Sequence, residues 1–368
     1  MEYIALKNIC KINMGQSPDS SSYNDNKDGI PFFQGNADFG EKYPVTRVWC
    51  NAPIKVAQPN DILISVRAPI GALNFAKEEC CIGRGLAALT PDRSKVSLEF
   101  IYWVLKWKKA ELNSKGTGST FKAISRKVLE ETLVPAIDFE KQYEYAEILG
   151  KTYSVIKKYK KELNCLDGLI KARFVELFDG KYPEDTLLNL CNIVDYRGKT
   201  PEKVEHGLPF ITAKNVKMHH MTLEPREYIS KETYDKVMVR GFPKEGDVVF
   251  TTEAPLGNVC RIPHFDTEFY IGQRIVTMQT DALNPTYLEY ALSDEEFVRK
   301  YMGKSSGSTV TGIRVRLLEQ LTIPVPPRTL QDEFATFVNQ VDKSKVAVQK
   351  ALDETQMLFD SLMQEYFG

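Results

Sequence analysis

The amino-acid sequence contains two copies of one pattern, and this internal duplication limits the fold more than any other feature. Short motifs of the first half return in the same order in the second half, and the separation settles at 189 residues, as between Gly83 and Gly272. A repeat of this length far exceeds the units of solenoid proteins. It predicts a duplicated domain whose two copies are related by an approximate two-fold axis. The paired segments are residues 6–10 and 187–191, 15–18 and 198–201, 29–32 and 207–210, 61–71 and 247–257, and 118–120 and 307–309.

Each copy combines strand and helix patterns. Residues 61–66 and 247–252 are largely apolar runs that follow turn signals, which is typical of buried strands. An Ala-Pro-x-Gly turn closes each run. Residues 97–110 and 286–301 have the apolar spacing of helices, and each is followed by a loop rich in Gly, Ser and Thr. The expected fold class is α+β, with two duplicated mixed α/β domains.

A long helix is predicted at the end of each copy. The first spans about residues 139–178 with Asp138 as its N-cap, and the second spans about 330–367 with Thr329 as its cap and Asp332 three residues later. Both carry an apolar heptad in the same register, so we expect an antiparallel coiled coil with pseudo-two-fold symmetry. Two ordinary bundle helices in one core are the alternative. The core positions are Leu149, Ile156, Leu163, Leu166, Ile170, Val338, Val341, Val348, Leu352, Phe359 and Leu362.

Charge and cysteine usage narrow the class of protein. The chain has 48 Lys and Arg against 49 Asp and Glu, a balance that argues against nonspecific coating of nucleic acid but permits a basic face. No apolar run reaches the roughly 18–20 residues of a membrane span, and the N-terminus lacks a secretory pattern. Seven cysteines without a Cys-x-x-Cys, with Cys80 and Cys81 adjacent, favour free thiols in a reducing cytoplasm.

The sequence contains no recognisable catalytic or metal site. Neither a Gly-x-Gly-x-x-Gly nor a P-loop motif occurs, and Glu-x-Lys is also absent. The Pro-Pro pair at 326–327 lacks the neighbours that an amino-methyltransferase needs to hold a flipped base. Two histidines, His219 and His220, are adjacent, His206 and His264 are isolated, and none has metal-ligand spacing. We therefore expect no catalytic residue, no metal and no cofactor in this chain.

The order of the motifs resembles that of the specificity subunits of type I restriction-modification systems over essentially the whole chain. The matching features are Gly-x-[Ser/Thr]-Pro, Gly-[Ile/Leu]-Pro-Phe, Ala-Pro-x-Gly, the Gly-Ser-Thr loop and a Leu-Glu segment that leads through a proline into a heptad helix. The resemblance implies target recognition domains at residues 1–138 and 181–326, a central spacer helix at 139–180 and a C-terminal spacer helix at 327–368. The first recognition domain begins almost at once, so a longer N-terminal extension of relatives is expected to be missing.

The resemblance also implies a function. The chain would be a noncatalytic cytoplasmic subunit whose two domains each read one half of a bipartite, asymmetric site on double-stranded DNA. The helices, roughly 55–60 Å long, would set the gap between the halves. They would dock two methyltransferase subunits, which bind S-adenosylmethionine, and a restriction subunit would join that complex. Two alternatives are a self-contained DNA-modifying or DNA-cutting enzyme and a purely structural interaction protein.

Polar side chains beside turns are the candidate DNA-reading residues. Lys and Arg supply affinity through phosphates, whereas Arg, Asn, Gln and Glu fit base edges. For Ser and Thr near the loop glycines, capping of a turn is an equal alternative. Arg67 and Glu253 occupy equivalent places, a difference that two unlike half-sites require but that surface drift explains equally well. The predicted residues are Gln34, Asn36, Arg67, Arg84, Thr117, Ser119, Thr120 and Lys122 in the first copy, and Lys214, Asn215, Thr252, Glu253, Gln273, Arg274, Ser306, Ser308 and Thr309 in the second.

The helix expected at residues 97–110 admits two interpretations. Lys106, Lys108 and Lys109 with Trp103 and Trp107 would form a basic, aromatic DNA face. Alternatively, the tryptophans pack inside and the lysines are solvated, which is the commoner arrangement for such a helix. The second interpretation is favoured.

Overall fold

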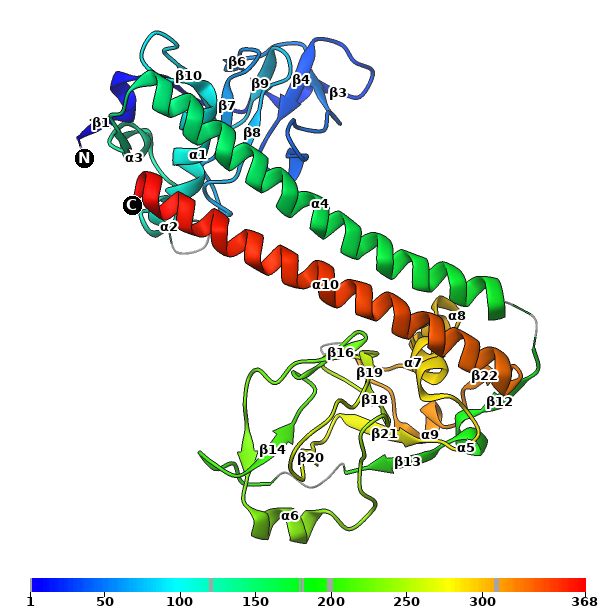
Figure 1. Cartoon of the computed structure of the whole chain (residues 1–368). Coiled ribbons are helices and arrows are strands. Elements are labelled where there is room, and N and C mark those ends of the chain that lie inside the picture. Colours follow the sequence, from blue (N-terminus) through cyan, green and yellow to red (C-terminus); the bar gives the residue numbers. More distant parts are fainter. Residues whose placement is uncertain (1, 119–121, 179, 181, 197–200, 308–310) are drawn as a thin grey trace. The chain divides into compact units, whose positions relative to one another are not determined.

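A computed structural model describes residues 2–118, 122–178, 180, 182–196, 201–307 and 311–368. The chain divides into two units. Unit 1 comprises Met1–Lys160 and Lys350–Gly368, and unit 2 comprises Lys161–Gln349. Both units contain parts of the two long helices, and each is described by itself (Figure 1).

Unit 1 is built on an antiparallel four-stranded sheet in the order β2-β10-β7-β8. Unit 1 also contains a separate five-stranded sheet in the order β3-β5-β4-β9-β6, in which β4 and β9 are parallel. The strands are β1 (Tyr3–Ala5), β2 (Cys10–Met14), β3 (Tyr23–Asn24), β4 (Ile30–Phe33), β5 (Trp49–Cys50), β6 (Val56–Ala57), β7 (Ile62–Ser65), β8 (Leu73–Phe75), β9 (Cys80–Ile82), β10 (Leu86–Pro91) and β11 (Leu133–Pro135). The short helices are α1 (Leu98–Trp107), α2 (Lys109–Ser114) and α3 (Arg126–Glu130), with 3-10 turns at Leu6–Asn8, Ser20–Ser22 and Asn36–Asp38.

Unit 2 repeats this plan. Its four-stranded sheet has the order β13-β21-β18-β19, and β14 and β20 form the parallel pair of a second sheet, β17-β14-β20. The strands are β12 (Glu184–Thr186), β13 (Asn192–Asp195), β14 (Leu208–Ile211), β15 (Val216–Lys217), β16 (His220–Met221), β17 (Tyr228–Ile229), β18 (Val248–Thr251), β19 (Val259–Arg261), β20 (Tyr270–Ile271), β21 (Ile275–Gln279) and β22 (Thr322–Pro324). The short helices are α5 (Leu187–Leu190), α6 (Lys231–Val237), α7 (Pro285–Ser293), α8 (Glu295–Lys304) and α9 (Val315–Leu318).

The matching strand orders confirm the duplication and the α+β fold class. The pairing of β1 with β11 corresponds to that of β12 with β22, and both four-stranded sheets are antiparallel throughout. The apolar runs at 61–66 and 247–252 form the buried strands β7 and β18, because every residue of both strands lacks solvent exposure. These strands lie next to the sheet centre, as their composition predicts.

The two long helices pack on each other within each unit. They are α4 (Phe139–Phe178) and α10 (Arg328–Phe367). In unit 1 the ring of Tyr145 stacks on Tyr366 at 3.8 Å, and Tyr153 contacts Phe359 at 5.6 Å. In unit 2 Lys345 pairs with Asp167 at 2.7 Å, and further along α4 the ring of Phe174 contacts Phe334 at 5.5 Å. Residue numbers rise on one helix as they fall on the other, so the segments are antiparallel.

The predicted core positions of these helices lie away from solvent. Leu149, Ile156, Ile170, Val338, Val341, Leu352 and Phe359 are buried, and the other four are half-buried. The start of α10 corrects the predicted cap: the helix begins at Arg328, directly after Pro327, so Thr329 lies in its first turn. Proline cannot continue the helix upstream of this point, because the residue before proline avoids the helical region.

Both predicted helices that follow the four-stranded sheets are shorter than expected. The run at 97–110 divides into α1 and α2, and the run at 286–301 divides at Asp294, whose carboxylate accepts from the Glu296 N–H and caps a new helix. In α1 the Trp103 ring is buried against Tyr153 and Phe359. This packing agrees with the interpretation that Trp103 belongs to the core.

The cysteines are free thiols in the structure. Six are buried, and Cys165 is exposed. Burial raises the pKa of Cys10, Cys80 and Cys191 to about 12, so these thiols stay protonated. None of the helices described combines the length and the hydrophobicity that a membrane span requires.

Candidate nucleic-acid interface

Four of the predicted DNA-reading residues line one hollow of unit 1. This hollow has a volume of about 540 Å³, and its walls include Gln34, Asn36, Arg67 and Arg84. Each of the four follows the end of a strand: Gln34 and Asn36 come after β4, Arg67 after β7 and Arg84 after β9. The ends of the paired strands β4 and β9 and the end of β7, which belongs to the four-stranded sheet, therefore bring together side chains that are far apart in the sequence. Gln34, Arg67 and Arg84 are exposed, and Asn36 is half-buried.

Backbone hydrogen bonds hold the walls of this hollow. The Asp38 carboxylate accepts from the backbone N–H of Gln34 at 2.7 Å and of Gly35 at 3.3 Å, which fixes the turn after β4. Gly85 passes so close to the carbonyl oxygen of Gln34 that a Cβ at this position would overlap it. The supporting residues Asp38 and Gly85 were not among the sequence candidates, because a carboxylate and a glycine carry no signal of nucleic-acid binding.

The Gly-x-Ser-Pro motif, residues 15–18, forms hydrogen bonds with the backbone at and near Arg84. The backbone N–H of Gly15 donates to the Leu86 carbonyl at 2.9 Å, and the Ser17 hydroxyl accepts from the Arg84 N–H at 3.3 Å. A Cβ on Gly15 would overlap the backbone of Gly83, so this position requires glycine. The motif therefore has a structural role, because it holds the backbone segment that carries Arg84.

The hollow has an excess of positive charge. Within the described part of the chain, neither Arg67 nor Arg84 forms an ion pair. The Asp38 carboxylate, which also lines the hollow, accepts two backbone N–H groups at Oδ2 and forms no ion pair with either arginine among the described residues. Two exposed guanidinium groups without a carboxylate partner are suited to phosphate oxygens or to the acceptor atoms of guanine.

The Gly-Ser-Thr loop of unit 1 adjoins Arg67. The Lys122 carbonyl accepts from the Ala68 N–H at 3.0 Å, and Thr117 and Ala123 exchange two backbone hydrogen bonds of 2.9 Å. Arg67 forms a β-bridge with the same Ala123. The structure thus brings Thr117 and Lys122 beside the hollow, whereas Ser119 and Thr120 lie outside the described residues.

Unit 2 reproduces these backbone contacts with different side chains. The N–H of Thr252 donates to the Arg274 carbonyl at 2.8 Å, as Val66 does to Gly85 at 2.9 Å. Glu253 forms a β-bridge with Gly312, and Ser306 exchanges two hydrogen bonds with the same glycine. Glu253 therefore occupies the place that Arg67 has in unit 1. Its carboxylate contacts the Arg274 Nε at 2.7 Å.

Asn215 has a structural role, which corrects its assignment as a DNA-reading residue. Its side chain is 1% exposed. The side-chain oxygen accepts from the Thr212 N–H and hydroxyl at 2.9 Å, and the amide donates to the carbonyls of Thr222 and Pro225 at 3.1 Å. These bonds use all four positions of the amide, so none is left for a base. Thr252 is also buried, and this too places it in the scaffold.

The remaining candidates of unit 2 differ in exposure. Lys214 is exposed and lies 3.9 Å from the carboxylate of Glu227, and Gln273 is half-buried. Ser306 is exposed beside Gly312. Ser308 and Thr309 lie outside the described residues. The sequence pattern therefore did not separate candidates that project, such as Lys214 and Ser306, from candidates that hold the turns, such as Asn215.

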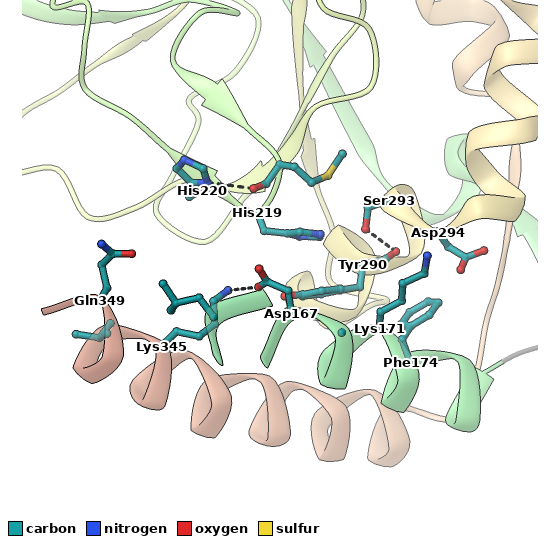
Figure 2. A pocket seen from close by; sticks show the side chains of 14 residues that line it. Asp167, Lys171, Phe174, His219, His220, Tyr290, Ser293, Asp294, Lys345 and Gln349 are labelled. Carbon is teal, nitrogen blue, oxygen red and sulfur yellow. Dashed lines mark hydrogen bonds and ion pairs between the residues drawn. The ribbon is translucent and has the colours of Figure 1, made fainter. Parts of the chain in front are cut away.

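A second hollow, of about 750 Å³, lies in unit 2 between the β15-β16 hairpin, α7 and the segments of the long helices (Figure 2). The His219 ring stacks on Tyr290 at 4.3 Å, and its Nδ1 contacts the buried Glu289 at 2.9 Å. Lys345 pairs with Asp167 across the helices. Because Lys345 and Glu289 each have a partner within the unit, we interpret this hollow as a packing contact between the hairpin and the helices. No group of three or more metal-ligating side chains occurs among the residues that the structure describes.

The fold and the two equivalent surfaces define a protein built from paired recognition units on a helical scaffold. The model of one family, described as the type I restriction modification DNA specificity domain, matches residues 1–165 and 186–355. The chain belongs to this family. Both copies are matched separately, as the internal duplication requires.

Relatives and a solved structure agree with this assignment. The chain is 42% identical over 171 residues to a protein of Methanocaldococcus jannaschii named as the MjaX type I restriction enzyme specificity subunit, a match that covers 46% of this chain and 40% of that relative. It is 23% identical over 333 residues to the MjaVIII specificity subunit of the same organism, over 80% of this chain and 77% of the relative. The type I restriction-modification S subunit of M. genitalium shares the fold, with a TM-score of 0.61, 15% identity and coverage of 100% of this chain and 96% of that chain.

Proposed function

We propose that this chain is the noncatalytic DNA-specificity subunit of a type I restriction-modification complex, and that each unit reads one half of a bipartite, asymmetric site. The observation that carries the proposal is the pair of equivalent surfaces: the same backbone hydrogen bonds present Arg67 in one unit and Glu253 in the other. Identical frameworks with unlike side chains are what two different half-sites require.

The scaffold helices give the proposal its geometry. Helices α4 and α10 run through both units and pack on each other in each. Their register sets the number of base pairs between the two half-sites. Two methyltransferase subunits dock on these helices and the adjoining surfaces, and a restriction subunit joins the complex through them. S-adenosylmethionine binds to the methyltransferase, and the assembly acts on double-stranded DNA in the cytoplasm.

The experiment is a footprint of the full chain, purified together with its methyltransferase partner, on DNA selected from a randomised duplex library. We expect two short protected segments separated by an unread gap. One contiguous protected segment, or no sequence enrichment at physiological salt, would contradict the proposal. Methyl transfer or cutting by this chain alone would instead establish the self-contained enzyme.

A double variant, Arg67→Ala with Arg84→Ala, tests the surface itself. Loss of two exposed guanidinium groups is expected to weaken specific binding by roughly tenfold or more, because charge-assisted contacts are the strong ones in such interfaces. The control is Arg93→Ala, an exposed arginine that follows the opposite end of β10. Equal affinity of the double variant and the control would remove the hollow from the interface.

A further inference from the structure

The two units place opposite hydrogen-bonding chemistry in the same position of the framework. In unit 1 this position holds Arg67, whose guanidinium only donates hydrogen bonds. In unit 2 it holds Glu253, whose carboxylate only accepts them. The position just before the neighbouring strand of the sheet, β10 in unit 1 and β21 in unit 2, differs as well, because unit 1 has Gly85 where unit 2 has Arg274. At this equivalent position, one surface therefore presents a hydrogen-bond donor and the other presents an acceptor.

Arg274 is kept where the backbone favours glycine. Its φ angle is 74°, in the left-handed region. An L-residue other than glycine adopts this conformation at a cost, so the surrounding structure must hold Arg274 in it. Its Nε lies 2.7 Å from the Glu253 carboxylate, and the two side chains stay 51% and 40% exposed. The pair is thus preformed and accessible, and its net charge is zero.

The loop opposite further restricts Glu253. Gly312 bridges to Glu253, and a Cβ on this glycine would lie 3.1 Å from the Glu253 side chain. The backbone of Glu253 is fixed by this bridge on one side, and its carboxylate is fixed by Arg274 on the other. The ion pair with Arg274 therefore favours one orientation of the carboxylate.

A carboxylate on a DNA-binding surface is repelled by phosphates, so its direct contact with DNA is favourable where it meets a hydrogen-bond donor on a base edge. In the major groove the amino group of cytosine is the donor that Glu and Asp accept from. We propose that Glu253, oriented by Arg274, reads the amino group of a cytosine in the half-site of unit 2. This inference rests on the proposed function and adds the base and the residue that reads it.

The test is the base preference of the full chain in complex with its methyltransferase partner, measured by selection from randomised duplex DNA and sequencing. The unmodified protein is expected to require cytosine at one position of one half-site. Glu253→Gln is expected to lower that preference at least about fivefold and to raise adenine there, because glutamine matches the adenine edge. The other half-site is expected to stay unchanged. The matched control is Glu245→Gln. Glu245 is an exposed carboxylate that precedes the start of β18, whereas Glu253 follows the end of this strand.

A second variant separates orientation from overall attraction. Arg274→Gln is expected to weaken the cytosine preference at the same position and to leave every other position as it was. If Arg274 served only phosphates, its loss would lower affinity for all sequences equally, and this outcome would overturn its positioning role. Retention of cytosine in Glu253→Gln, with a two-part site still selected, overturns the inference alone. Failure of the unmodified protein to select a two-part site overturns the proposed function together with the inference.

Discussion

Replacement of Phe334 by alanine tests whether the recognition core of unit 2 and the helix segments form one packed body. Phe334 lies on α10 and is completely buried. Its ring contacts Phe174 at 5.5 Å and Phe178 at 5.6 Å on α4, and Tyr290 at 5.3 Å on α7. The side chain therefore joins both long helices to the helix that covers the sheet.

The expected loss follows from this burial. A Phe→Ala change in a packed core costs about 3–5 kcal/mol, because apolar transfer energy is lost and a cavity remains. For units of 150 to 250 residues, each kcal/mol lowers the melting temperature by about 2–4 °C. We therefore expect the melting of unit 2 to fall by about 6–20 °C.

The assay is differential scanning calorimetry of the full chain, with Phe242→Ala as the control. Phe242 belongs to the same unit but is 57% exposed, so its truncation is expected to change stability by less than about 0.5 kcal/mol. A melting shift of Phe334→Ala no larger than that of Phe242→Ala would refute the reasoning, because it would mean that the helix segments do not share the core of the unit.

Three further outcomes test the local chemistry of unit 2. Gly257→Ala is expected to lower the melting temperature, because Gly257 has a φ of 92° and a Cβ there would overlap the Tyr301 hydroxyl. The hydrogen bond to Glu245 raises the pKa of His264 above its ordinary 6.5, so NMR titration is expected to show a raised value that falls in Glu245→Gln. Since the folded pKa is the raised one, any stabilisation by this pair is present at low pH and is lost as pH rises through that pKa. Asn215→Ala is expected to destabilise the chain by at least about 1–3 kcal/mol in thermal melts, because two carbonyls and two donors lose their partner.

The duplication made most of the fold predictable. Repeated motifs at constant separation predicted two similar domains, and the bounds of α4 agree with the expected helix because its heptad pattern is continuous. The division at Asp294 was missed, because apolar spacing continues across a residue whose side chain caps a new helix. The strand orders and the parallel pairing of β4 with β9 were also beyond reach, because pairing between distant strands leaves no local pattern.

The candidate site was predictable in part for a similar reason. Gln34, Asn36, Arg67 and Arg84 all follow strand ends, and the ends of strands from both sheets of unit 1 line the same hollow, so proximity to turns was enough to group these four residues. The same signal failed for Asn215, because a polar residue in a turn can use its amide on the turn itself. The predicted domain limits at 138, 180 and 326 stay predictions, as do the DNA contacts of the projecting residues.

The distribution of exposure shows how one framework can serve two sequences. Arg67 and Glu253 project from positions that β-bridges to Ala123 and Gly312 hold through the backbone, so exchanging these projecting side chains is expected to change stability by about 0.5 kcal/mol or less. Recognition can therefore change at these positions without disturbing the fold. Gly85 and Arg274 do not follow this rule: the first is required by a close approach, and the second carries a backbone conformation that its residue type disfavours. Departures from local preference are most often found at functional or strained sites, and the left-handed backbone of Arg274 is therefore consistent with its proposed role beside Glu253.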